Sequence, residues 1–133
     1  MPKASVLQFH NYEAEEMVYR SVPVSEDRHE FELRPQFDHN VIELGEGNYD
    51  VRLSFSLRPT EEYPMPFELK VSMVGHFTYQ EQEGEDTVVK DHILQENTVS
   101  ILFPFLRSIV AALTSNANIP TLMLPVMNFT KND

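Results

Sequence analysis

A helix-forming stretch near the end of the chain, residues 101 to 115, constrains the fold more than any other feature. Its large apolar residues recur at the spacing of one helical face and are Leu102, Phe105, Leu106, Ile109 and Leu113. The other side carries only small residues: Ser108, Ala111, Ala112 and Ser115. Such a helix can bury its bulky face on its own sheet and its smooth face against a second backbone. We therefore predict a core helix whose small face is an oligomer interface, although most helices of this pattern are core helices alone.

The boundaries of this helix are predicted from its capping residues and its proline. Pro104 has no N–H and disfavours helix in the residue before it, so we expect the helix to begin or kink there. Asn97 and Thr98 are both candidate caps because their side chains accept hydrogen bonds from free N–H groups. The preceding segment, 87–95, is predicted to be either a short helix or a connection.

Upstream of the helix, four segments alternate apolar and polar residues as antiparallel strands do: 5–21, 37–44, 49–58 and 67–79. The alternation slips between Phe9 and Tyr12, which predicts a bulge. Gly45-Glu46-Gly47-Asn48 is a strong turn signal and predicts a hairpin. Gly75 predicts a bulge or a close backbone approach. The expected class is α+β: a four-stranded antiparallel sheet with bulges, followed by a long C-terminal helix on one face.

Composition limits the class of protein and its partners. The 133 residues are expected to form one domain, 1–133, and the net charge of -11 argues against nucleic acid and anionic membranes as partners. The chain has no cysteine, and no window resembles a signal peptide or a membrane span. We expect a cytoplasmic protein without membrane insertion.

The sequence contains no pattern that is typical of an enzyme. It has no phosphate-binding glycine loop, no Gly-x-Ser-x-Gly and no His-Glu-x-x-His. Two histidines, His29 beside Glu30 and His39 beside Asp38, come nearest to a metal cluster, but zinc needs three or four converging ligands. We expect no catalytic residue, no metal and no cofactor.

The run Ile101-Leu102-Phe103-Pro104-Phe105-Leu106-Arg107 and the later segment from Pro120 to Phe129 together resemble the C-terminal half of the SecB export-chaperone family. That family has an Ile-Leu-Phe-Pro-aromatic run, a nearby arginine, a helix, and a Pro-x-Leu-x-Leu segment that closes on Pro-Val-Asn-Phe. Here Pro125 falls one position early and Met127 separates Val126 from Asn128. Since the sequence ends at Asp133, it looks most like the shorter SecB-like proteins of Gram-positive bacteria.

The resemblance implies an ATP-independent holdase that binds unfolded or precursor polypeptides as a homodimer or homotetramer, with protein export as its setting. Methionine and aromatic residues near prolines suit surfaces that accept varied partners. Together with the resemblance, they predict a client-binding set: Phe55, Leu57, Met65, Phe67, Phe103, Phe105, Leu122, Met123, Leu124, Met127 and Phe129.

In the export chaperones an acidic sheet face docks the SecA motor. The corresponding carboxylates here are Glu16 and Glu68, interrupted by Arg20 and Lys70. Two other hypotheses remain open. One is a structural or adaptor protein of this fold that binds one folded partner or an antitoxin-type client. The other is a small-molecule-binding or enzymatic domain, and the absence of motifs argues against it.

Overall fold

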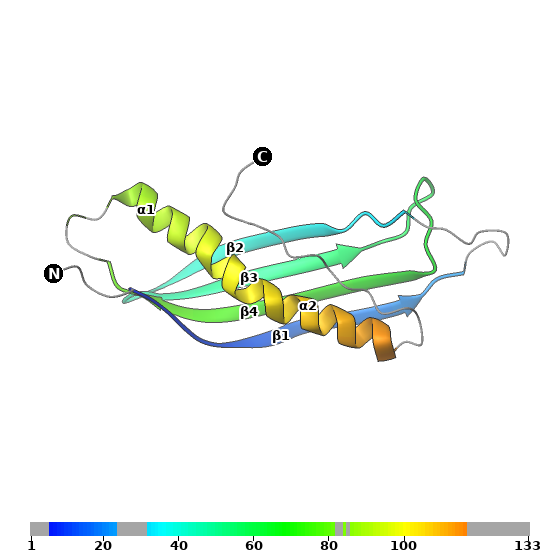
Figure 1. Cartoon of the computed structure of the whole chain (residues 1–133), viewed down its shortest axis with the longest axis horizontal. Helices are drawn as coiled ribbons and strands as arrows, with labels where there is room; N and C mark the ends of the chain where they lie inside the picture. Colours follow the sequence, from blue (N-terminus) through cyan, green and yellow to red (C-terminus); the bar gives the residue numbers. More distant parts are fainter. Residues whose placement is uncertain (1–5, 24–31, 82–83, 85, 117–133) are drawn as a thin grey trace.

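The computed structural model describes residues 6–23, 32–81, 84 and 86–116 (Figure 1). Its elements follow in the order β1 (Leu7–Ser21), β2 (Gln36–Gly45), β3 (Asn48–Leu57), β4 (Phe67–Tyr79), α1 (Thr87–His92), η1 (Ile93–Asn97) and α2 (Thr98–Asn116). The strands form one antiparallel sheet in the order β1-β4-β3-β2. The helical run crosses one face of this sheet diagonally, from the side of β2 to the side of β1 (Figure 1). This confirms the predicted fold class.

The two central strands, β3 and β4, form the middle of the core because each is flanked by strands on both sides. The alternating residues of β3, from Val51 to Leu57, have side chains that are at most 1% exposed. The predicted hairpin joins β2 to β3, and Gly45, Glu46 and Gly47 all have positive φ in its turn. Alternation of Phe31 and Leu33 between Glu30 and Arg34 is compatible with a short strand, but residues 32–34 are not a strand. Residues 30 and 31 lie outside the described residues.

Strand β1 carries two bulges, where its register against β4 shifts between Phe9 and Asn11 and again between Ala14 and Glu16. The first is the bulge predicted from the slip in alternation; the second was not predicted. Each bulge inserts one residue, so the apolar positions stay on the helix side of the sheet along the whole strand. Tyr12 thus lies opposite Gly75, and Met17 opposite Val71.

The segment 87–95, predicted to be a short helix or a connection, is helical, so the helical run begins before the predicted caps Asn97 and Thr98. Asp86 is its N-cap and accepts a hydrogen bond from the Val88 N–H at 2.9 Å. Thr98, a predicted cap, is instead buried inside the helical run, where its hydroxyl donates to the Leu94 carbonyl at 2.6 Å. Pro104 was predicted to start or kink the helix; it does not start it, because it lies within α2. Pro104 and Ser100 are both exposed, so water can hydrate the Ser100 carbonyl, which loses its usual helical N–H donor at residue 104.

The helix packs on the sheet through residues that are fully buried: Val99, Leu102, Leu106 and Val110. Leu102 and Leu106 were predicted for this face, whereas Phe105, Ile109 and Leu113 lie at its flank and are only partly buried against the core. Gly75 makes the predicted close approach, since a Cβ there would lie 2.6 Å from Leu102 Cδ2. Length and hydropathy alone would let the run Thr87–Asn116 cross a bilayer, but core helices commonly share both properties.

Candidate functional site

An apolar surface remains half exposed along the edge strand β1. We call it the β1 strip and define it as Phe9, Tyr12, Met17, Tyr19 and Phe105. The Phe105 ring of α2 contacts Phe9 and Tyr12, with centroids 5.7 and 4.6 Å apart. Met17 is 55% exposed although it lies on the helix side of the sheet. Aromatic and methionine side chains here can still lose water-exposed area against a partner.

At the opposite edge of the sheet, a smaller aromatic group lies under the helix. Phe37 of β2 is half buried, and its ring contacts Phe55 and Phe103 with centroids 5.3 and 5.8 Å apart. Only Phe37 of the three keeps appreciable exposure. Of these two groups, the β1 strip is therefore the more exposed.

The structure places the predicted client-binding residues in three groups. The first group belongs to the core, with exposures of at most 8%, and consists of Phe55, Leu57, Met65, Phe67 and Phe103. These side chains expose too little surface in this structure to contact a client. Phe105 is half buried within the β1 strip. The remaining residues, Leu122, Met123, Leu124, Met127 and Phe129, lie outside the described residues.

Sequence reasoning missed most of the β1 strip, namely Phe9, Tyr12, Met17 and Tyr19. Their apolar character was visible, but none of them was included in the predicted client-binding set. A signal existed, because a bulged strand often lies at a sheet edge. An edge strand has a neighbour on one side only, so its apolar residues are less completely covered.

The predicted oligomer interface lies on the outer side of α2. Ser108, Ala112 and Ser115 are exposed, and Ala111 is half buried. The four residues present a surface with little side-chain bulk, on which another helix or sheet can approach closely. Packing of a second copy on this face stays a prediction.

The sheet face away from the helix, which we call the outer face, carries charges that pair across strands. Arg52 of β3 reaches over β4 to Glu15 of β1 and makes two hydrogen bonds, Nε–Oε1 at 2.7 Å and Nη2–Oε2 at 3.1 Å. The hydrogen bonds from Arg52 lower the pKa of the Glu15 carboxyl, although partial burial opposes this. Two parallel N–H···O bonds are the strongest form of such a pair.

His76 of β4 bridges two carboxylates on the strands to either side. Its Nδ1 lies 2.7 Å from Asp50 Oδ1 of β3, and its Nε2 lies 2.6 Å from Glu13 Oε1 of β1. The hydrogen bond to Asp50 and then that to Glu13 raise the pKa of His76 above its ordinary value. The protonated ring donates from both nitrogens, so it ties three strands together.

The two carboxylates predicted for motor docking are close to cations. Glu16 pairs with Lys70, Oε1 to Nζ at 3.1 Å. Glu68 is half buried and lies opposite Arg20 in the β1–β4 register. The acidic patch expected from the family resemblance is therefore partly neutralised in this chain.

The histidines near carboxylates do not converge into a ligand set. Within the described ranges there is no group of three His, Asp or Glu side chains that could hold a metal ion. His39 Nε2 lies 3.1 Å from Gln95 Oε1, and His92 pairs with Glu96 one helical turn later. His29 lies outside the described residues.

The family described as preprotein translocase subunit SecB matches residues 7–131. The protein-export protein SecB of Anaplasma phagocytophilum (strain HZ) is 35% identical over 81 residues, which are 61% of this chain and 51% of that protein. That of Legionella pneumophila (strain Corby) is 27% identical over 106 residues, which are 80% of this chain and 64% of that protein. The chain thus spans about half the length of its Anaplasma relatives.

Among solved structures, the Mycobacterium tuberculosis Rv1957 SecB-like chaperone, in complex with a ChAD peptide from the Rv1956 HigA1 antitoxin, matches with a TM-score of 0.70 at 18% identity. The match covers 92% of this chain and 88% of that chain. At this identity it shows a shared fold: the bulged four-stranded sheet and the long helix described above. Because the family match extends over both sheet and helix, the chain belongs to the SecB family.

Proposed function

We propose that this protein is an ATP-independent, oligomeric holdase that binds non-native polypeptides and keeps them from aggregating, with protein export as its setting. The observation that carries the proposal is the β1 strip, a half-exposed apolar surface on an edge strand of a SecB-family domain. A holdase needs apolar contact area and no reaction chemistry. The absence of catalytic motifs from the sequence agrees with this requirement.

The β1 strip suits clients of varied sequence for a physical reason. Burying one large apolar side chain contributes roughly 1.5–3 kcal/mol, so a few contacts suffice for reversible binding. Met17 is flexible and polarizable and adapts to different partners. The edge of β1 also offers backbone groups with which an extended client can pair.

The proposal includes self-association through the small face of α2. Ser108, Ala111, Ala112 and Ser115 would allow a second copy to approach closely, giving a homodimer or homotetramer in the cytoplasm. Docking of SecA at Glu16 and Glu68 is not included, because Glu16 pairs with Lys70 and Glu68 lies opposite Arg20.

A second candidate function is that of an adaptor for one specific partner, without an export role. It is favoured by the fold match to the mycobacterial protein, which is in complex with a peptide from an antitoxin. An adaptor would bind one partner with high selectivity and ignore unrelated unfolded chains. The two functions therefore differ in the range of polypeptides bound.

The test is suppression of aggregation of a heat-denatured reporter protein, followed by light scattering at stoichiometric ratios without ATP. Met17→Glu should weaken the suppression because it places a charge in the β1 strip. Leu44→Glu is the matched control: Leu44 is 57% exposed against 55% for Met17, and it lies at the end of β2. Equal loss in both variants, or no suppression by the wild type, would contradict the proposal. Native mass measured on the same samples separates a contact defect from a loss of assembly.

A further inference from the structure

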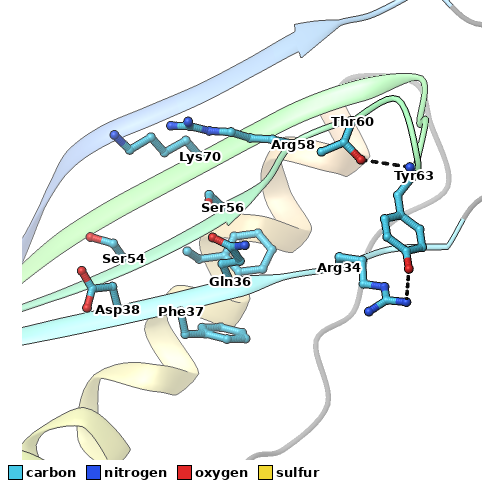
Figure 2. Close-up of a pocket in the computed structure, with 11 residues that line it drawn as sticks. Arg34, Gln36, Phe37, Asp38, Ser54, Ser56, Arg58, Thr60, Tyr63 and Lys70 are labelled. Atoms are coloured by element: carbon cyan, nitrogen blue, oxygen red, sulfur yellow. Dashed lines mark hydrogen bonds between the residues drawn. The ribbon is translucent and has the colours of Figure 1, made fainter.

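A groove of about 830 Å³ opens on the outer face of the sheet, next to the β3–β4 loop (residues 58–66). Figure 2 shows its residues: Ser54 and Ser56 of β3 and Asp38 of β2 form the floor, and three cationic side chains surround it. The volume lies within the range of ligand-binding clefts, roughly 300–1,000 Å³. This groove lies on the sheet face opposite to the helix, so it is separate from the β1 strip.

The charge of the groove is opposite to that of the protein. Arg34, Arg58 and Lys70 line it together with a single carboxylate, that of Asp38. Lys70 also pairs with Glu16 of β1 at 3.1 Å, whose carboxylate does not line the groove. In the whole chain, 21 acidic residues outnumber 10 lysines and arginines. The net charge of -11 is enough to keep the protein soluble. A positively charged cleft on such a protein therefore needs another explanation than solubility.

Arg34 is held in place at the loop end of the groove. Its Nη2 donates to the Tyr63 hydroxyl at 2.7 Å, and its guanidinium carbon lies 4.1 Å from the centroid of the Tyr63 ring. Tyr63 is itself fixed, because its N–H donates to the Thr60 hydroxyl at 2.9 Å. Arg34 also pairs with the exposed Glu32 at 3.1 Å, which leaves other guanidinium donors for a ligand. A cation oriented in advance loses less side-chain entropy on binding.

Arg58 is the cation most available to a ligand. In the part of the chain that the structure describes, Arg58 has no ion pair and no hydrogen-bond partner for its side chain, and it is exposed. Its side chain lies beside that of Lys70 along one wall of the groove, while Arg34 and Tyr63 lie at the other end (Figure 2). The cations are thus spread along the cleft rather than gathered around one point.

We propose that this groove binds an acidic segment of a partner protein in an extended conformation, with its carboxylates paired to Arg58, Arg34 and Lys70. Side chains on one face of an extended chain recur about every 6.6–6.8 Å, so such a segment presents a row of carboxylates. A single phosphate would need cations that converge. The hydroxyls of Ser54 and Ser56 supply neutral hydrogen-bonding groups for the backbone of the segment.

The protein's own negative charge sets the character of this interaction. An acidic partner is repelled at long range and attracted only at the groove, so binding depends on short-range pairing and weakens as salt rises. The partner segment is therefore a short acidic stretch rather than a strongly acidic domain. The site goes beyond holdase function, because it lies on the other face of the sheet and leaves the β1 strip open.

The test uses fluorescence anisotropy at low ionic strength with a labelled octapeptide of alternating Glu and Ser. Arg58→Glu is expected to raise the Kd at least about tenfold, equivalent to about 1.4 kcal/mol. Arg20→Glu is the matched control, because it changes the net charge by the same amount. Arg20 is also exposed on the outer face, but it does not line the groove. It should change the Kd less than about twofold. Arg34→Gln, which adds no negative charge, should also weaken binding.

Three results would overturn this proposal. One is equal weakening by Arg58→Glu and Arg20→Glu, which would mean that only the net charge matters. Another is equal binding of a peptide in which lysine replaces each glutamate. The third is displacement of the peptide by inorganic phosphate at equal concentration, which would identify a simple anion site. Each variant should retain the wild-type circular dichroism spectrum and the wild-type suppression of reporter aggregation.

Discussion

Gly75 of β4 and Leu102 of α2 meet at the point where the helix crosses the sheet. A Cβ at position 75 would lie 2.6 Å from Leu102 Cδ2 and 2.8 Å from Phe77 Cε1. The helix can reach this depth only because residue 75 has no side chain. The contact fixes the height of the helix above the sheet and, with it, how far Phe105 covers Phe9 and Tyr12.

The first prediction concerns this contact. Gly75→Ala should lower the free energy of unfolding by about 1–3 kcal/mol, because an added methyl group overpacks the core. Chemical denaturation measures the change. In a Leu102→Ala background, Gly75→Ala should lower the free energy of unfolding by less, because the Leu102 methyl groups that the new Cβ would meet are absent. Additive effects of the two substitutions would show that Gly75 does not limit the approach of the helix.

The second prediction concerns His76 and pH. Its folded pKa is raised by Asp50 and Glu13, so its contribution to stability is complete below its unfolded pKa, about 6.5, and is lost as pH rises through the higher folded value. Unfolding by denaturant should therefore show the wild type more stable than His76→Gln at pH about 6, with a smaller difference at pH about 8.5. A difference that does not change with pH would contradict the charged bridge.

The third prediction concerns the pair of Arg52 and Glu15. Both side chains are 39% exposed, so solvent screens the pair, and Arg52→Met should cost less than about 1 kcal/mol of unfolding free energy. The folded pKa of Glu15 is lowered, so this contribution is present above the unfolded pKa and is lost as pH falls through the folded value. Denaturation at neutral and acidic pH measures both. A cost of several kcal/mol at neutral pH would show that the pair is far less screened than its exposure indicates.

The fourth prediction concerns the small face of α2. Ala112→Arg should dissociate the proposed oligomer, because an arginine at this exposed position prevents close approach of a second copy. Multi-angle light scattering would then give the mass of a smaller species. Val88→Arg is the control, since Val88 is 71% exposed in α1 at the far end of the helical run. An unchanged mass for Ala112→Arg would exclude this face as the interface.

The sequence allowed the sheet and the helix to be predicted because their signals are local. Period-two alternation from Tyr49 to Leu57 belongs to a strand that is covered on one face, and the slip after Phe9 marks a bulge. The start of the helical run was predicted only as one of two alternatives for residues 87–95. Val88 and Val89 are exposed, so α1 shows no apolar face, and it is Asp86 that caps it.

The functional surfaces depend on register and were harder to predict. Glu13, His76 and Asp50 lie on three different strands and meet only through the pairing of β1 and β3 with β4, which the sequence alone did not indicate. The basic groove likewise gathers Arg34, Arg58 and Lys70 from separate segments. Conversely, Phe55 and Leu57 were predicted to contact clients, but their central strand buries them.

The most direct test of the central claim is the native mass with and without an unfolded polypeptide, by size exclusion with multi-angle light scattering in the absence of ATP. The holdase account predicts a dimer or tetramer that gains the mass of the unfolded chain and does not gain that of the same chain when folded. An oligomer that ignores unfolded chains would contradict the account and would favour the adaptor function.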